Sequence, residues 1–222
     1  MSASFDAVDG KLREADFFLV KLAEAGLDCD AWRFYFSAFV SAARSVTFAI
    51  QHAMRRIDGF DEWYSARQKV LRENALCRFF TSVRNETQKR GTNPVTVWHG
   101  SNECDVEAFF LYWYEDPDQM PPDEDVVASA QQYMEMLASL VYEAYRDFGH
   151  FIDPAVVYSL EGARRRGLSI EDIEQELIGV RGWTASLPTE ERFRILRENE
   201  PMPQIDDILV KYLGHDRFGT KT

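Results

Sequence analysis

The sequence predicts a mainly α-helical protein, an up-and-down helical bundle with a small β-hairpin inserted in it and an extension of short helices after it. Apolar residues recur at three- and four-residue spacing along most of the chain, as they do in helices that bury one face. Hydrophobic residues make up 45% of the 222 residues and aromatic residues 14%, which is too apolar for a disordered chain. One short segment is instead rich in β-branched and aromatic residues, which favour strands.

The first two expected helices supply a large part of the core. Asp9 is a suitable N-cap for a helix over residues 11–25, which ends at Gly26. Asp30 then begins a longer amphipathic helix over residues 31–55. Small residues alternate with aromatic ones along this helix, which permits close approach of a neighbouring helix or of a second copy of the chain. These small residues are Ser37, Ala38, Ser41, Ala42 and Ser45.

Two shorter helices and the hairpin come next. The helices are expected over residues 61–72 and 75–89. Pro94 ends helix formation, and the β-branched and aromatic residues after it predict a β-hairpin over about residues 94–115 that turns near residues 100–102.

A second long core helix is expected over residues 124–148, with acidic residues in its first turn, where they suit the helix dipole. A further helix begins at Pro154, runs into three arginines and stops at Gly167. We therefore assign residues 1–166 to the helical bundle.

Residues 167–222 form the expected C-terminal helical extension, packed on the bundle. Ser169 and Asp172 have the spacing of a capping box for a helix over residues 170–178. Two more helical segments follow, over residues 188–198 and 205–213.

Charge is distributed unevenly along the chain, whose net charge is −12. Residues 33–90 contain 11 Lys and Arg against 5 acids, whereas residues 91–145 contain 11 acids and no Lys or Arg. An acidic chain repels nucleic acid at long range, so any RNA contact requires a concentrated cationic patch. The alternative is that the two blocks face each other, within one subunit or across a dimer.

The sequence lacks the features of membrane, secreted, disulfide-bonded and zinc-binding proteins and of several common enzyme families. The apolar patterns are interrupted by charges, so we expect no transmembrane helix, and no secretory signal is expected at the N-terminus, which favours a cytoplasmic protein. Three cysteines without a CxxC pair argue against a disulfide framework or a zinc site. The sequence contains no phosphate-binding loop, dinucleotide fingerprint, HExxH or GxSxG motif, and no cofactor is expected.

Residues 75–91 are the stretch in which chemistry is most expected. An apolar helical face there is followed directly by a polar, cationic run that starts at Arg84 and Asn85. An Arg-Asn pair near a helix end, preceded by the long aromatic helix, resembles the signature of the HEPN superfamily of helical bundle proteins. The resemblance covers about residues 30–91.

The resemblance implies a HEPN-like bundle that works as a homodimer. In active members it implies metal-independent RNA cleavage, in which the Arg stabilises phosphate charge and a His shortly after it transfers protons. In this chain Lys89, Arg90 and Gly91 stand where that His is expected. The resemblance then implies a non-catalytic binding or regulatory protein, with Arg84, Asn85, Lys89 and Arg90 as RNA- or phosphate-binding residues.

Three alternatives remain open at this point. A displaced histidine, His99 in the hairpin or His52 on the long helix, would restore a ribonuclease whose catalytic candidates are Arg84, Asn85 and His99. The protein can instead be a structural adaptor whose acidic face meets a basic protein partner. In the third alternative, Arg84 and Asn85 only hydrogen-bond helix ends and pair with the acidic segment.

Two further features are His150 and Trp183. His150 has acids nearby but only one strong metal ligand at suitable spacing, so no metal site is expected. Trp183, which follows an Arg-Gly turn, is interpreted as a buried anchor that holds the extension to the bundle, with base stacking as the alternative.

Overall fold

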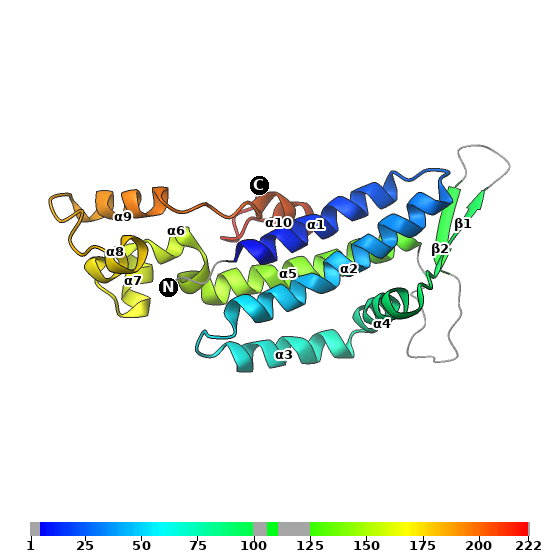
Figure 1. Cartoon of the computed structure of the whole chain (residues 1–222), viewed down its shortest axis with the longest axis horizontal. Coiled ribbons are helices and arrows are strands. Elements are labelled where there is room, and N and C mark those ends of the chain that lie inside the picture. The colour runs from blue at the N-terminus through cyan, green and yellow to red at the C-terminus, as the bar shows by residue number, and fades with distance from the viewer. Residues whose placement is uncertain (1–4, 100–105, 111–124, 222) are drawn as a thin grey trace.

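The chain folds into an elongated, mainly helical molecule (Figure 1). The computed structural model describes residues 5–99, 106–110 and 125–221. Within these residues there are ten helices and one two-stranded antiparallel sheet, which confirms the mainly α prediction. Among the helices of this described part, none combines the length and the hydropathy needed to cross a lipid bilayer.

Three long helices form the body of the bundle: α1 (Asp6–Ala23), α2 (Cys29–Met54) and α5 (Val126–Ile152). They run alongside one another in Figure 1. Each turns its apolar stripe to a shared core, because the three- and four-residue spacing puts those side chains on one face. The side chains buried to the greatest extent include Leu12, Phe36, Phe39, Met134 and Leu137.

Two shorter helices, α3 (Phe60–Glu73) and α4 (Ala75–Arg90), cover the side of this body. Asn74 joins them and caps α4 by accepting a hydrogen bond from the backbone N–H of Cys77. The predicted apolar face of α4 is buried, and the ring of Phe80 stacks on Tyr133 of α5 with centroids 4.6 Å apart. This packing positions the polar side of α4 beside α2, α3 and α5.

The hairpin lies at one end of the bundle (Figure 1). Strands β1 (Val95–His99) and β2 (Val106–Phe110) pair antiparallel, with Val95 opposite Phe110. Phe110 anchors the hairpin against Phe79 of α4 and Phe36 of α2. The turn predicted near residues 100–102 and the predicted hairpin residues 111–115 fall outside the described residues.

Asp9 is not the N-cap of the first helix, contrary to the sequence prediction. The helix α1 begins at Asp6, because Phe5 and Val8 are themselves buried and extend the apolar face towards the N-terminus. Asp9 lies inside the helix, where its Oδ2 accepts a hydrogen bond from the hydroxyl of Tyr145 at 2.7 Å.

Three other predicted boundaries also shift. Asp28, rather than Asp30, caps α2. The helix α5 continues to Ile152, and the single helix predicted from Pro154 is divided into α6 (Pro154–Val157) and α7 (Leu160–Arg166). Ser159 causes the division, since its side chain caps α7 through the backbone N–H of Gly162.

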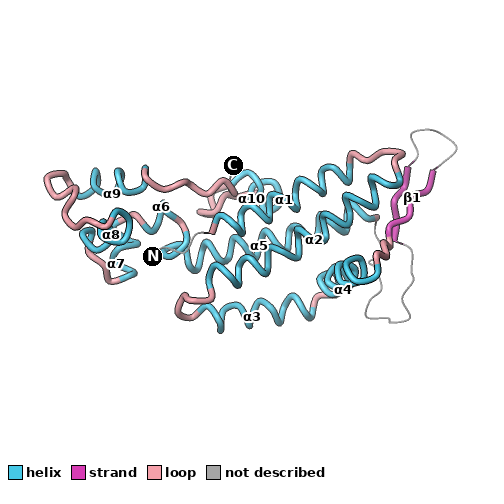
Figure 2. The backbone as a smooth tube through the Cα atoms, viewed as in Figure 1, coloured by secondary structure: helices cyan, strands magenta, loops and turns pink. Residues whose placement is uncertain are grey.

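The C-terminal elements are α8 (Ile170–Ile178), α9 (Thr189–Glu198) and α10 (Asp206–Leu213). The capping box that Ser169 and Asp172 predict is present at the start of α8. In Figure 2, helices α6 to α9 gather at the end of the molecule opposite the hairpin, whereas α10 returns to the bundle.

Buried residues form two separate clusters. The smaller one lies among α6 to α9 and contains Val157, Tyr158, Ala163, Ile173, Phe193 and Leu196. The larger one is the bundle core, which also takes in Ile205, Ile208 and Leu209 at α10. The predicted boundary between residues 1–166 and 167–222 stays a prediction, but the clusters place α6 and α7 with the following helices and α10 with the bundle.

Candidate anion-binding site

The polar side of α4 carries the residues that the sequence singles out. Arg84 is half-buried, and its Nη1 donates to Asn85 Oδ1 at 3.3 Å. Its Nε is buried without a hydrogen-bond partner among the described residues. Within that part of the chain Arg84 forms no ion pair with an acid, so the expected pairing with the acidic segment is not seen there.

Asn85 lines a cavity of about 360 Å³ between α2, α3, α4 and α5. Three arginines also line it: Arg44 from α2, Arg72 from α3 and Arg78 from α4. No Asp or Glu is among the lining residues in ranges 5–99, 106–110 and 125–221. The remaining lining residues are Thr47, Tyr64, Gln68, Leu71, Cys77, Thr81, Ser82, Tyr133 and Leu137.

The three arginines donate to neutral groups, Arg72 from its Nη2 to Gln68 Oε1 at 3.5 Å. Arg44 donates from Nη1 to Thr47 Oγ1 at 3.1 Å, and its guanidinium lies over the ring of Phe48. Arg78 donates from Nη1 to the last carbonyls of α3, those of Arg72 at 3.1 Å and of Glu73 at 2.8 Å. Over residues 5–99, 106–110 and 125–221, none of the three arginines forms an ion pair with a carboxylate.

Nearby acids are engaged elsewhere. Glu73 pairs with Lys69 at 3.9 Å, and Glu86 pairs with Arg90 at 3.1 Å. On another side of α3, Arg67 binds Glu143 at 2.9 Å and Asp147 at 3.4 Å. The cationic charge of the cavity is therefore left without a local counter-ion in the described part of the chain.

The cavity floor is formed by core residues. Tyr64, Cys77, Tyr133 and Leu137 are all buried. Burial raises the pKa of the Cys77 thiol to about 12, and it also raises the pKa of the Tyr133 hydroxyl. Both groups stay protonated at neutral pH, so neither supplies a nucleophile or a base.

The histidines do not complete a catalytic site in the described structure. His52 is exposed on α2 and does not line the cavity. The side chain of His99 falls outside the described residues. His150 lies 17 residues beyond Tyr133 on α5, about 25 Å along the helix axis. Burial lowers the pKa of His150, and the charges of Arg165 and Arg166 lower it further.

No group of three or more His, Cys, Asp or Glu side chains that could hold a metal ion occurs among the residues described. His150 is therefore not brought into a metal centre by its neighbours there. Its Nδ1 is buried without a hydrogen-bond partner in that part of the chain.

Lys89 and Arg90 lie on the exposed last turn of α4 and do not line the cavity. The structure thus brings Asn85 together with Arg44, Arg72 and Arg78, which the sequence prediction did not include. The excess of basic residues over residues 33–90 was the available signal, but it did not distinguish these three from the other cations.

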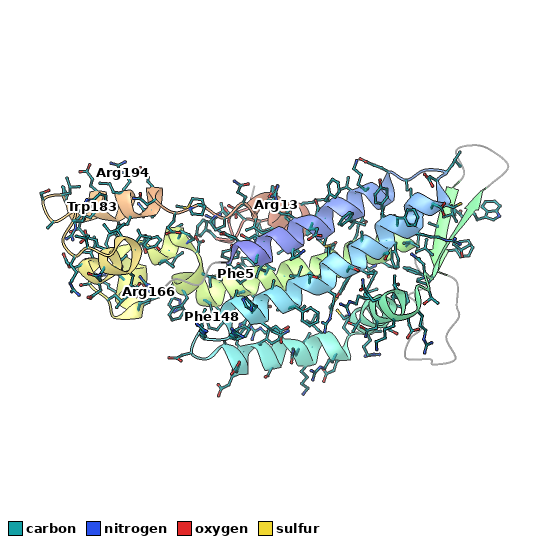
Figure 3. All side chains as sticks on the ribbon, viewed as in Figure 1. Phe5, Arg13, Phe148, Arg166, Trp183 and Arg194 are labelled. Atoms are coloured by element: carbon teal, nitrogen blue, oxygen red, sulfur yellow. The ribbon has the colours of Figure 1, made fainter. Side chains whose placement is uncertain are left out.

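Trp183 is not a buried anchor, contrary to the sequence interpretation. Its side chain is 52% exposed, and Figure 3 shows it at the end of the molecule farthest from the hairpin. The residue that follows it, Thr184, is buried instead and donates to Glu174. The extension is held to the bundle by α10 rather than by this tryptophan.

Comparison with known proteins gives one result. No curated protein and no solved structure matches the chain. Residues 3–149, more than half of the chain, match the family described as bacteriophage lambda protein ea47, and the protein belongs to this family; the match runs from before α1 to the last turn of α5.

Proposed function

We propose that the protein is a non-catalytic, HEPN-like RNA-binding protein with a regulatory role, which holds RNA phosphate in the arginine-lined cavity. The observation that carries the proposal is the convergence of Arg44, Arg72 and Arg78 on one cavity, with no carboxylate among the lining residues that the structure describes. Guanidinium groups bind phosphate through paired hydrogen bonds, and like charges gathered at one place favour an anionic ligand.

Most donors of these arginines remain available for a ligand. Each guanidinium carries five N–H donors, and those of Arg44 and Arg78 have only Nη1 engaged in the hydrogen bonds described above. Thr81 and Asn85 of α4 and Gln68 of α3 add neutral polar groups to the lining of the cavity. This set can bind phosphate oxygens without first breaking an ion pair.

The polar side of α4 gives a path along which the rest of an RNA strand can run. Arg78 and Asn85 line the cavity, and Lys89 and Arg90 follow them towards the exposed end of the same helix. Phosphate contacts of this kind position a strand without reading its sequence. We therefore expect binding that is strong at low salt and weakens as salt is added.

The proposal is for binding rather than cleavage. General acid–base cleavage needs a titrating group near the phosphate, and neither Cys77 nor Tyr133 titrates near neutral pH. His52, one of the two displaced candidates, does not line the cavity. The homodimer and the basic protein partner expected from the sequence stay predictions.

A direct test uses single-stranded RNA and fluorescence anisotropy at low salt. The double variant Arg44→Gln/Arg72→Gln is expected to raise Kd at least about tenfold, since it removes two of the three lining charges. Arg78 is left intact because it also holds the carbonyls that end α3.

Arg194→Gln is the matched control, since Arg194 is an exposed arginine of α9, far from the cavity, and Figure 3 shows its position. Its Kd should equal that of the unaltered protein. Absence of RNA binding at low salt, or an unchanged Kd in the double variant, would contradict the proposal. Shortening of the RNA in the presence of EDTA would instead favour the ribonuclease alternative.

A further inference from the structure

We infer that the cavity takes the terminal phosphate monoester of an RNA strand, in preference to an internal phosphodiester. This inference rests on the proposed function and names the part of the RNA that enters the same site. It is carried by the number of arginines at the cavity and by its buried floor.

The charge at the cavity suits a terminal phosphate. Arg44, Arg72 and Arg78 bring three positive charges to one space of about 360 Å³, and no Asp or Glu lines it within the described part of the chain. An internal phosphodiester carries a single negative charge, whereas a phosphate monoester carries about −1.5 to −2 at pH 7 and three strong acceptor oxygens. The monoester therefore leaves less of the arginine charge uncompensated and offers each guanidinium an oxygen.

The buried floor of the cavity also favours a strand end. Its floor consists of Leu137, Cys77, Tyr133 and Tyr64, whose exposed fractions are 0%, 4%, 4% and 6%. These side chains belong to the bundle core and form the bottom of the cavity between four helices. An internal phosphate has a nucleotide on each side, so the strand must both enter and leave, whereas a terminal phosphate needs only one way in.

The size of the cavity is compatible with this ligand. A volume of about 360 Å³ falls in the range of about 300–1,000 Å³ found for sites that enclose small ligands. The lining is polar at the arginines, Gln68 and Asn85 and apolar at the floor, so the phosphate would lie among the arginines with the first nucleotide beside it. A free nucleoside monophosphate has the same chemistry as a phosphorylated strand end.

The experiment compares RNA strands of one sequence that differ only at their ends. Single-stranded RNAs labelled at an internal position carry a 5′-phosphate, a 3′-phosphate or two hydroxyl ends, and Kd is measured by anisotropy at pH 7.5 and low salt. We expect one of the two phosphorylated strands, with its phosphate at the 5′ or the 3′ end, to bind about tenfold more tightly than the strand with two hydroxyl ends (the hydroxyl strand). In the Arg44→Gln/Arg72→Gln variant this advantage should disappear.

Two further arms test the chemistry. The second pKa of a phosphate monoester is about 6, so the tenfold advantage in affinity should shrink between pH 7.5 and pH 5.5. The affinity for the hydroxyl strand should show no such loss. An excess of free nucleoside monophosphate should reduce the affinity for the phosphorylated strand to that of the hydroxyl strand. Persistence of the advantage in its presence would show that the terminal nucleotide is not the bound unit.

The result that would overturn this inference is an equal Kd for all three strands at pH 7.5. Because that result still includes RNA binding, it would leave the proposed function standing. Absence of binding by every strand would contradict the proposed function itself, so the two failures are distinguishable.

Discussion

Arginines in two regions of the molecule have opposite surroundings. In the C-terminal helices, buried Arg192 donates from Nη2 to Glu171 at 2.7 Å and to Glu174 at 3.2 Å, and from Nε to the hydroxyl of Thr184 at 2.8 Å. At the cavity in the bundle, Arg44 and Arg72 contact only neutral groups in the described structure. The same residue type is thus a structural cation in one region and an available cation in the other.

The difference in burial explains how both arrangements are stable. Arg192 is 9% exposed and Glu174 is fully buried, so each buried charge would be destabilising without the opposite charge beside it. Burial alone would raise the pKa of Glu174, but hydrogen bonds from Thr184 and Arg192 outweigh it and lower that pKa. Arg44 is only half-buried and Arg72 is exposed, so water can solvate them while the cavity is empty. An arginine that is solvated in this way can exchange water for an anionic ligand.

The largest expected effect comes from breaking the paired region. Arg192→Met leaves Glu174 buried without a cation, which should lower the free energy of unfolding by about 3–5 kcal/mol. Urea denaturation followed by circular dichroism measures this change. Arg194→Met, at an exposed arginine two residues away with two exposed partners, should cost less than about 1 kcal/mol. Equal losses of unfolding free energy in the two variants would show that burial of the Arg192–Glu174 pair does not determine how much it stabilises the fold.

Asp9 extends the comparison to a buried acid that forms no ion pair with any residue that the structure describes. Burial is the main cause that raises its pKa from 3.8 to about 7, Asp6 raises it further, and the hydrogen bond from Tyr145 opposes both. The folded protein therefore binds this proton more tightly than the unfolded chain does. The resulting stabilisation is present in full below about pH 4 and is lost as the pH rises to about 7.

Replacing Asp9 with Asn imitates the protonated acid at every pH. The Asp9→Asn variant should therefore be more stable than the unaltered protein at pH 8, by on the order of 3 kcal/mol, and similar to it at low pH. Denaturation at pH 4, 6 and 8 tests this expectation. Parallel pH profiles for the two proteins would contradict it, because they would show that the pKa of Asp9 is the same in the folded and the unfolded state.

The smallest expected effect comes from introducing a carboxylate into the cavity lining with Gln68→Glu. Gln68 Oε1 already accepts from Arg72 Nη2 at 3.5 Å, so Gln68→Glu should pair with Arg72 and compete with RNA phosphate. We expect affinity for RNA to fall about tenfold, or about 1.4 kcal/mol, with a change in the free energy of unfolding below about 1 kcal/mol. The neutral variant Gln68→Met is the control for the added charge and should lose less affinity for RNA than Gln68→Glu. Unchanged binding by Gln68→Glu would show that phosphate does not enter at Arg72.

Much of the local structure was predictable because its causes are local. The periodic apolar face predicts a helix over residues 75–89, and α4 spans Ala75–Arg90. Ser169 and Asp172 cap α8 as predicted, since both partners lie within one helical turn. Asp9 was wrongly predicted as a cap because its role depends on Tyr145, which lies 136 residues away in the chain.

The sequence by itself determined the helices, the hairpin and the presence of a basic block next to an acidic one, because hydrophobic spacing, capping residues and charge counts act along the chain. Of the predicted site residues it identified Asn85 on the cavity wall. Only the tertiary structure decided which arginines meet there, since Arg44, Arg72 and Arg78 come from three different helices. Helix periodicity says which face of a helix is buried, but packing decides which faces meet and whether a carboxylate lies opposite each cation.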